Sequence, residues 1–180
     1  MNAPEILETS RLVLRKPRRE DAPLIFESYA RDPEVTRYLL WQPHTDVSES
    51  YAAIDRFLAA WEARTEFVWL IFLQDQLVGS IAARKEENAL NLGYLLARPF
   101  WGRGYMPEVI RAVEEWAFTN PAIFEVWAEC DLENRASART LEKAGFVREG
   151  VLPQFRVFPN LSSTPRDCYR YTVRRDISRR

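Results

Sequence analysis

Histidine and cysteine are scarce in this chain of 180 residues, and their scarcity excludes several kinds of site. The single histidine, His44, excludes a metal centre built from several imidazoles and leaves one candidate for an imidazole base. The two cysteines, Cys130 and Cys168, are too few for a disulfide framework or a zinc site, and this usage is typical of a reducing compartment. We therefore expect no metal ion and a cytoplasmic location.

Long apolar runs and net charge are also lacking. The longest strongly apolar run, residues 67–73, is well short of the roughly 18 residues that span a bilayer, and the opening residues MNAPEILETS do not resemble a secretory signal. The 25 lysines and arginines nearly cancel the 26 aspartates and glutamates, so the net charge of -1 provides no general attraction for nucleic acid. We expect neither a membrane nor a nucleic-acid partner.

The sequence does contain enough apolar material for one folded domain. Hydrophobic residues make up 47% of the chain, and no repeat or long linker divides it, so we expect a single domain over residues 1–180. Alternating and helical hydrophobic periods indicate an α+β fold. The expected strands are residues 11–16, 67–73, 77–84, 90–97, 123–130, 146–158 and 165–175, and the expected helices are residues 20–30, 48–61, 106–118 and 135–144.

The order of these elements predicts a mixed sheet. Residues 67–73 and 77–84 flank a short polar connection, which favours an antiparallel hairpin. A strand, a helix and a strand follow one another over residues 90–130, which predicts a right-handed crossover between parallel strands. Ser48 is expected to cap the helix that follows it, and Gly145 to end the helix 135–144.

The segment LLARPFWGRGYMPEV, residues 95–109, carries the clearest chemical signal. Gly102 and Gly104 lie between a strand and a helix, where bare backbone and the helix N-terminus favour an anion such as a phosphate. Arg103 adds a positive charge to the same loop. Taken alone, a Gly-x-Gly turn more often only joins a strand to a helix. The segment also lacks the spacing of a Walker loop or a dinucleotide-binding fingerprint.

A second segment, NRASARTLEKAGF at residues 134–146, follows one crossover later. Asn134 is a natural N-cap, and Ser137 and Leu141 share a face near the start of the helix. A capped amphipathic helix explains Asn134, Leu141 and Gly145. It gives no reason for polar groups at the helix start to face the preceding strand.

Together these segments make the chain resemble the GNAT family of N-acetyltransferases, and within it the ribosomal-protein N-terminal acetyltransferases of the RimJ/RimL type. The resemblance extends over nearly the whole chain. Its motifs are TSRLVLR at residues 9–15, Asp32-Pro33-Glu34, Gly93-Tyr94, WGRGY at residues 101–105, and Asn134-x-x-Ser137 with the residues through Phe146. It implies a mixed, mostly antiparallel central sheet of about seven strands, with a strand-helix-strand crossover and helices on both faces.

The resemblance also implies acetyl-CoA as cosubstrate, held in a gap between two parallel strands. The pantetheine arm would pair with the backbones of Leu95, Leu96 and Ala97. The pyrophosphate would be held by the amides of Gly102, Arg103, Gly104, Tyr105 and Met106. Asn134 would hydrogen-bond the pantetheine, and Ser137 would protonate or solvate the leaving thiolate, so both are expected to serve catalysis.

The resemblance assigns no general base. Asn91 stands where many relatives carry a glutamate, and Arg156 and Val157 stand where some carry another carboxylate. His44, in a loop expected to face the acceptor, has an ordinary pKa of about 6.5 and is one candidate. Glu129 and a water-mediated route are the others. Direct transfer needs no covalent nucleophile, so both cysteines are expected to be packed thiols.

We therefore expect an N-acetyltransferase that transfers acetyl directly from acetyl-CoA to a primary amine, with a protein N-terminus as one acceptor class. A small amine, such as a polyamine, an amino acid or an aminoglycoside, is the alternative acceptor. The asparagine at position 91 leaves a third interpretation, a non-catalytic sensor that binds acyl-CoA. The sequence leaves monomer and homodimer equally open.

Overall fold

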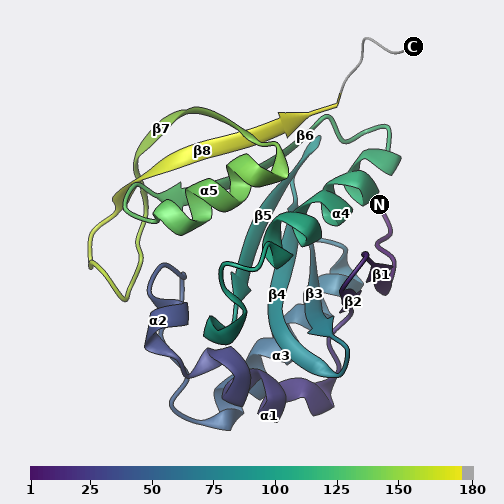
Figure 1. The fold of residues 1–180 in the computed structure, drawn as a ribbon, viewed down its shortest axis with the longest axis vertical. Helices are drawn as coiled ribbons and strands as arrows, with labels where there is room; N and C mark the ends of the chain where they lie inside the picture. Colours follow the sequence, from purple (N-terminus) through teal and green to yellow (C-terminus); the bar gives the residue numbers. More distant parts are fainter. Residues whose placement is uncertain (176–180) are drawn as a thin grey trace.

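The computed structural model describes residues 1–175, so the last residues of the expected domain 1–180 lie outside the described range. Within that range, eight strands form one sheet in the order β1-β2-β3-β4-β5-β6-β8-β7 (Figure 1). The strands are β1 (Ile6–Glu8), β2 (Val13–Arg15), β3 (Glu66–Leu73), β4 (Gln76–Lys85), β5 (Ala89–Leu96), β6 (Glu125–Asp131), β7 (Val147–Arg156) and β8 (Arg166–Arg174). The helices are η1 (Arg19–Asp21), α1 (Ala22–Ile25), the π-helix η2 (Phe26–Ala30), α2 (Pro33–Thr36), α3 (Val47–Ala63), η3 (Arg98–Phe100), α4 (Tyr105–Thr119) and α5 (Arg135–Ala144).

The sheet is mixed, as the sequence predicted. Every pair of neighbouring strands is antiparallel except β5 and β6, which are parallel and joined by α4. The sequence pattern missed β1, because this short strand buries too little to show an alternation; Ile6, for example, is 57% exposed.

Helices cover both faces of the sheet (Figure 1). On one face, Val109 and Ile110 of α4 and Leu141 of α5 join the main core with Leu90 and Leu92 of β5. On the other face, a smaller core lies beneath the helices of the N-terminal third. It brings together Ile25, Tyr29, Ile54, Leu70 and Leu77. The sheet therefore separates two sides of the molecule, and any site that reaches both must pass through it.

The start of α3 differs from the prediction, because Asp46 and not Ser48 caps this helix. The Asp46 carboxylate accepts the Ser48 N–H at 2.8 Å, and Glu49 accepts the Asp46 N–H at 3.3 Å. This reciprocal capping box makes Val47 the first helical residue. The other predicted helix ends hold: Asn134 caps α5, and Gly145 ends it with a φ of +99°.

Candidate active site

The parallel strands β5 and β6 separate after a short contact. They pair only at residues 89–91, whereas β4 follows β5 as far as Leu96. Beyond Asn91, no strand in the described part of the chain pairs with the edge of β5 that faces β6. A cavity of about 560 Å³ includes this gap; its lining contains Ser137 and Cys130 as well as Glu129 and residues of α2 and α3. The gap is thus an opening in the sheet that both sides of the molecule line.

The glycine loop lies between η3 and α4, and Gly102 and Met106 line the same cavity. Gly102 and Gly104 both have a φ of +75°, a left-handed conformation that residues with a Cβ rarely adopt. Gly104 caps α4 without a side chain that could accept hydrogen bonds, so the first N–H groups of the helix remain for an anion. Arg103 is exposed, and its guanidinium lies over the Phe100 ring.

A salt bridge from the N-terminal segment fixes the glycine loop. Arg11 donates to the carbonyl oxygens of Arg103 and Gly104, each at 3.2 Å, and its Nη2 lies 2.6 Å from Glu108 Oε2. The Thr9 hydroxyl donates to the same carboxylate at 2.6 Å. Burial raises the pKa of Glu108, but these hydrogen bonds outweigh burial and lower the pKa overall. Sequence reasoning missed this clamp, because Arg11 and Glu108 are 97 residues apart.

Ser137 lies at the start of α5, opposite β5. Asn134 Oδ1 accepts the Ser137 N–H at 3.1 Å, as expected for an N-cap. The Ser137 hydroxyl oxygen lies 2.8 Å from the Tyr94 hydroxyl on β5. Burial raises the pKa of Tyr94, so this hydroxyl keeps its proton at neutral pH. Tyr94 belonged to a sequence motif but had no predicted role.

The two cysteines are buried thiols, in agreement with the sequence-based expectation. Burial raises the pKa of Cys130 to about 11 and that of Cys168 to about 12. The thiolate is the nucleophilic form of cysteine, and neither residue forms it readily near neutral pH.

A row of polar side chains crosses the sheet on the side that faces α3. Arg84 Nε lies 2.9 Å from Glu66 Oε1, and Arg84 Nη1 donates to Asn91 Oδ1 at 3.2 Å. Asn91 Nδ2 donates to Glu129 Oε2 at 2.7 Å, and Arg156 Nε donates to Glu129 Oε1 at 2.8 Å. The side chain of Glu129 is only 9% exposed. The two departures noted in the sequence, Asn91 and Arg156, therefore both bind one carboxylate from the strand between β5 and β8.

His44 lines the cavity from the loop that precedes α3. Its Nδ1 lies 2.8 Å from the hydroxyl oxygen of the buried Ser50, and its ring lies 5.0 Å from the Trp41 ring. Burial lowers the pKa of His44 below its ordinary value. The structure thus places a neutral imidazole in the lining of the cavity, with one ring nitrogen already engaged.

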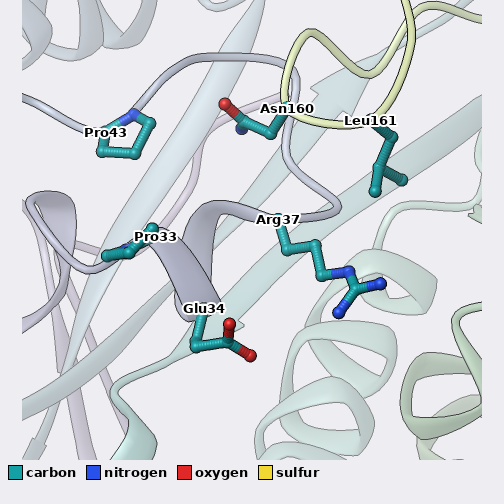
Figure 2. A pocket seen from close by; sticks show the side chains of 6 residues that line it. All are labelled: Pro33, Glu34, Arg37, Pro43, Asn160 and Leu161. Carbon is teal, nitrogen blue, oxygen red and sulfur yellow. The ribbon is translucent and has the colours of Figure 1, made fainter.

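The loop between β7 and β8 closes over the segment that follows α2. Asn160 Nδ2 donates to the carbonyl oxygens of Thr36 at 2.7 Å and Trp41 at 2.8 Å. Figure 2 shows Asn160 together with Pro33, Glu34 and Pro43 around a surface pocket of about 380 Å³. Sequence reasoning gave Asn160 no role, because the segment that it ties lies more than 100 residues earlier in the chain.

No group of three or more histidine, cysteine, aspartate and glutamate side chains that could hold a metal ion occurs in residues 1–175. In the same range, none of the helices combines the length and the apolar character needed to cross a membrane.

Comparison with known proteins decides the family. A family model for the acetyltransferase (GNAT) domain matches residues 11–147, which include the Arg11 clamp, the glycine loop and Ser137. This chain belongs to the GNAT family. The family and its curated relatives make it an N-acetyltransferase that uses acetyl-CoA as cosubstrate.

The similarity to known proteins extends over most of this chain. The uncharacterized N-acetyltransferase YoaA of Bacillus subtilis is 32% identical over 93% of this chain and 96% of its own length. The ribosomal protein uS5-alanine N-acetyltransferase of Escherichia coli is 27% identical over 86% of this chain and 84% of its own length. Among solved structures, RimL, a ribosomal L7/L12 alpha-N-protein acetyltransferase in complex with coenzyme A, matches with a TM-score of 0.86. It is 22% identical and covers 96% of this chain and 99% of its own, which shows a common fold.

Proposed function

We propose that this chain transfers the acetyl group of acetyl-CoA directly to a primary amine, and that this amine is the N-terminus of a protein. One observation carries the proposal: a single cavity has Ser137 and the glycine loop in its lining together with Glu129 and the acceptor-facing residues. A thioester held in the β5–β6 gap would lie within reach of an amine that enters from the opposite side. Positioning of the two reactants then replaces a covalent relay.

The pantetheine arm of acetyl-CoA is assigned to the free edge of β5. The Leu95 carbonyl faces β4, since a Cβ on Gly79 would collide with it, and the Ala97 N–H donates to the Val78 carbonyl at 2.8 Å. Backbone groups alternate in direction along a strand, so Leu96 directs its own toward the gap. Of the three residues expected to pair with pantetheine, Leu96 is the one with the required direction, and its N–H is the group proposed to pair, because its carbonyl oxygen already accepts from Trp101 Nε1 at 2.7 Å.

The pyrophosphate is assigned to the N-terminus of α4 and to the amides of residues 102–106. The helix dipole and the free N–H groups both favour an anion there. Arg103 is exposed beside this position and adds a positive charge. Arg11 keeps the loop in place through the carbonyls of Arg103 and Gly104, so the amides are oriented before the anion binds.

Ser137 and Asn134 are assigned to the thioester end of acetyl-CoA. As the carbon–sulfur bond breaks, the Ser137 hydroxyl donates a hydrogen bond to the developing thiolate, and oriented donors of this kind stabilise the charge of a transition state. Asn134 uses its Oδ1 to hold the Ser137 N–H, which leaves its NH₂ group for a pantetheine carbonyl.

Two observations support a protein N-terminus as the acceptor. The cavity reaches the surface at the exposed residues Glu34, Arg37 and Leu40, so a polypeptide could continue outward from the reacting amine. The similar Escherichia coli protein is named as an N-acetyltransferase of an alanine of ribosomal protein uS5, so its acceptor is a protein. His44 lines the same side, and we assign it to shaping the acceptor pocket.

A coenzyme A release assay with three sets of acceptors tests this proposal. The first set is tetrapeptides that begin with a free serine or alanine, the second is the same peptides blocked at the N-terminus but carrying a lysine, and the third is spermidine, free amino acids and an aminoglycoside. We expect release with the first set only. Release of coenzyme A with the third set alone would show that the acceptor is a small amine and not a protein N-terminus. Tight binding of acetyl-CoA without release on any acceptor would identify a sensor.

A further inference from the structure

Three carboxylates line the cavity of the gap, and only one of them lies on a strand that forms the gap. Glu34 is exposed on α2, and Glu66 lies on β3, separated from the gap by β4 and β5. Glu129 lies on β6, past the last pair between β5 and β6, Asn91 with Trp127. An amine that attacks a thioester in the gap would therefore pass Glu129.

The surroundings of Glu129 hold its carboxylate in one orientation. Asn91 donates to one oxygen at 2.7 Å and Arg156 to the other at 2.8 Å. The guanidinium compensates the charge of the nearly buried carboxylate, whose side chain is 9% exposed. Each carboxylate oxygen can accept a second hydrogen bond. Glu129 thus has acceptor capacity left for an ammonium group or for a water molecule beside one.

The alternation of side chains along β6 places Glu129 on the face of the sheet opposite to Ser137, the proposed donor to the thiolate. Successive side chains of a strand point to opposite faces of the sheet. Cys130 belongs to the core on the side of α4 and α5, where Ser137 lies, so Glu129 points to the other face. Its hydrogen bond to Asn91 confirms this side. A group for the amine and a group for the leaving sulfur therefore stand on opposite sides of the gap.

The geometry points to Glu129 as the group that binds the acceptor amine and takes up its proton, with Asn91 and Arg156 as the residues that position it. This inference rests on the proposed function. The acceptor ammonium gives one proton to Glu129, which passes it to solvent. The nitrogen lone pair then forms the carbon–nitrogen bond while the carbon–sulfur bond breaks. The second proton leaves the nitrogen for solvent, and the thiolate gains the proton of the Ser137 hydroxyl, which solvent then replaces, so that the products are the amide and coenzyme A.

Glu129→Gln tests this role, because the amide keeps the size of the side chain and loses its capacity to take up a proton. The measurement is kcat/KM for a tetrapeptide with a free N-terminal serine, from about pH 6.5 to 9.5, since an α-amino group has a pKa of about 7.7–8.0. We expect a loss of about 100-fold near pH 7, the scale of general base catalysis, and a smaller loss at high pH, where the amine is already neutral. Equal activity, or the same loss at every pH, would overturn the inference.

A matched control is Glu125→Gln, four positions earlier on β6. Glu125 also accepts from an arginine, Arg170, at 2.7 Å but does not line the cavity. We expect its kcat/KM to stay within about two-fold of the wild type, as for most partly exposed ion pairs. Glu129→Asp, which keeps a carboxylate, should recover part of the activity that Glu129→Gln loses. If it recovers none while acetyl-CoA still binds, Glu129 acts only through packing and the inference fails.

Asn91→Asp tests positioning separately. A second carboxylate beside Glu129 would make proton uptake at Glu129 easier, and should move the acid limb of the pH profile to higher pH. The other groups around Glu129 are Arg156 on β7, Arg84 behind Asn91, and the Cys168 thiol on β8, whose pKa burial and Glu129 both raise. An unmoved acid limb would remove Asn91 from this role.

The proposed function and this inference fail in different ways. If the wild type releases no coenzyme A with any of the acceptors, the proposed function itself fails. If the wild type is active and the Glu129→Gln variant is equally active, only the inference about Glu129 fails.

Discussion

The hydroxyl oxygens of Tyr94 and Ser137 lie 2.8 Å apart, on two elements that face one another where β5 and β6 separate. Tyr94 is half-buried, and the loss of solvent around its hydroxyl raises its pKa, so it stays protonated and can donate to Ser137. Ser137 is then free to direct its own proton to the sulfur of the cosubstrate. One hydrogen bond thus joins a residue of the β5 edge to the proposed donor for the thiolate.

Removal of this hydrogen bond should slow turnover without weakening acetyl-CoA binding. We expect Ser137→Ala to lower kcat by about 100-fold, the scale of losing one oriented donor in a transition state. Tyr94→Phe should lower kcat by about two- to ten-fold, since it removes one neutral hydrogen bond. Steady-state kinetics and acetyl-CoA titration measure both. In the double variant, Tyr94→Phe should add almost nothing to Ser137→Ala; fully additive effects would show that Tyr94 does not act through Ser137.

Gly104→Val should weaken acetyl-CoA binding. A β-branched residue is strained at a φ of +75°, and it would move the start of α4 on which the proposed pyrophosphate site depends. We expect an affinity loss of about ten-fold or more, equivalent to about 1.4 kcal/mol, by titration calorimetry. Gly150→Ala on β7 is the control, because a Cβ there meets nothing within 4 Å. Unchanged affinity in a folded Gly104→Val variant would show that the phosphate site lies elsewhere.

His44 should make the fold less stable in mildly acidic solution. Its pKa is lowered in the folded state, mainly by burial, so the unfolded chain binds the proton more tightly. The free energy of unfolding that His44 contributes is therefore fully present above the unfolded pKa of about 6.5, and it is lost as the pH falls below that value. Urea unfolding at pH 7.5 and at pH 5.5, about one unit on each side of that pKa, measures the change. His44→Gln should show a smaller decrease than the wild type; an equal decrease would assign it to other groups.

Asn160→Asp should loosen the proposed acceptor side of the site. The substitution keeps the shape of the side chain, but it replaces two hydrogen bonds with repulsion between a carboxylate and the carbonyl oxygens of Thr36 and Trp41. We expect a higher KM for the acceptor, with acetyl-CoA affinity unchanged. Ser163→Ala, exposed in the same loop, is the control and should behave as the wild type. An unchanged acceptor KM would mean that this tie does not shape the acceptor site.

The sequence predicted the elements that carry a strong local pattern. Both ends of the helix 135–144 were predicted correctly, because Asn134 favours the N-cap position and Gly145 favours the left-handed conformation that ends a helix. The crossover through α4 followed from the order of strand, helix and strand. The cap of α3 was wrong by two residues, because the Asp46–Glu49 pair outcompetes a serine inside the first turn.

The groups that complete the site could not be read from local patterns. Three pairs of residues meet only after the chain has folded: Arg11 with Glu108, Asn91 with Glu129, and Asn160 with Thr36. Asn91 shows the consequence most clearly. In the sequence it looked like a missing carboxylate, whereas in the structure its amide holds the carboxylate of Glu129 from the neighbouring strand. A residue type at one position did not reveal the chemistry of the site, because the functional group had come from another strand.

The direct transfer of acetyl to an amine is tested most sharply by mixing the protein with acetyl-CoA, first alone and then with an N-terminal serine peptide. Coenzyme A release and the intact mass of the protein are followed together. Without the peptide, we expect no release and no acetylated protein, since Cys130 and Cys168 are buried thiols. With the peptide, one coenzyme A should appear for each acetylated N-terminus. Coenzyme A release with an acetyl group left on the protein, or bound acetyl-CoA that no amine consumes, would refute direct transfer.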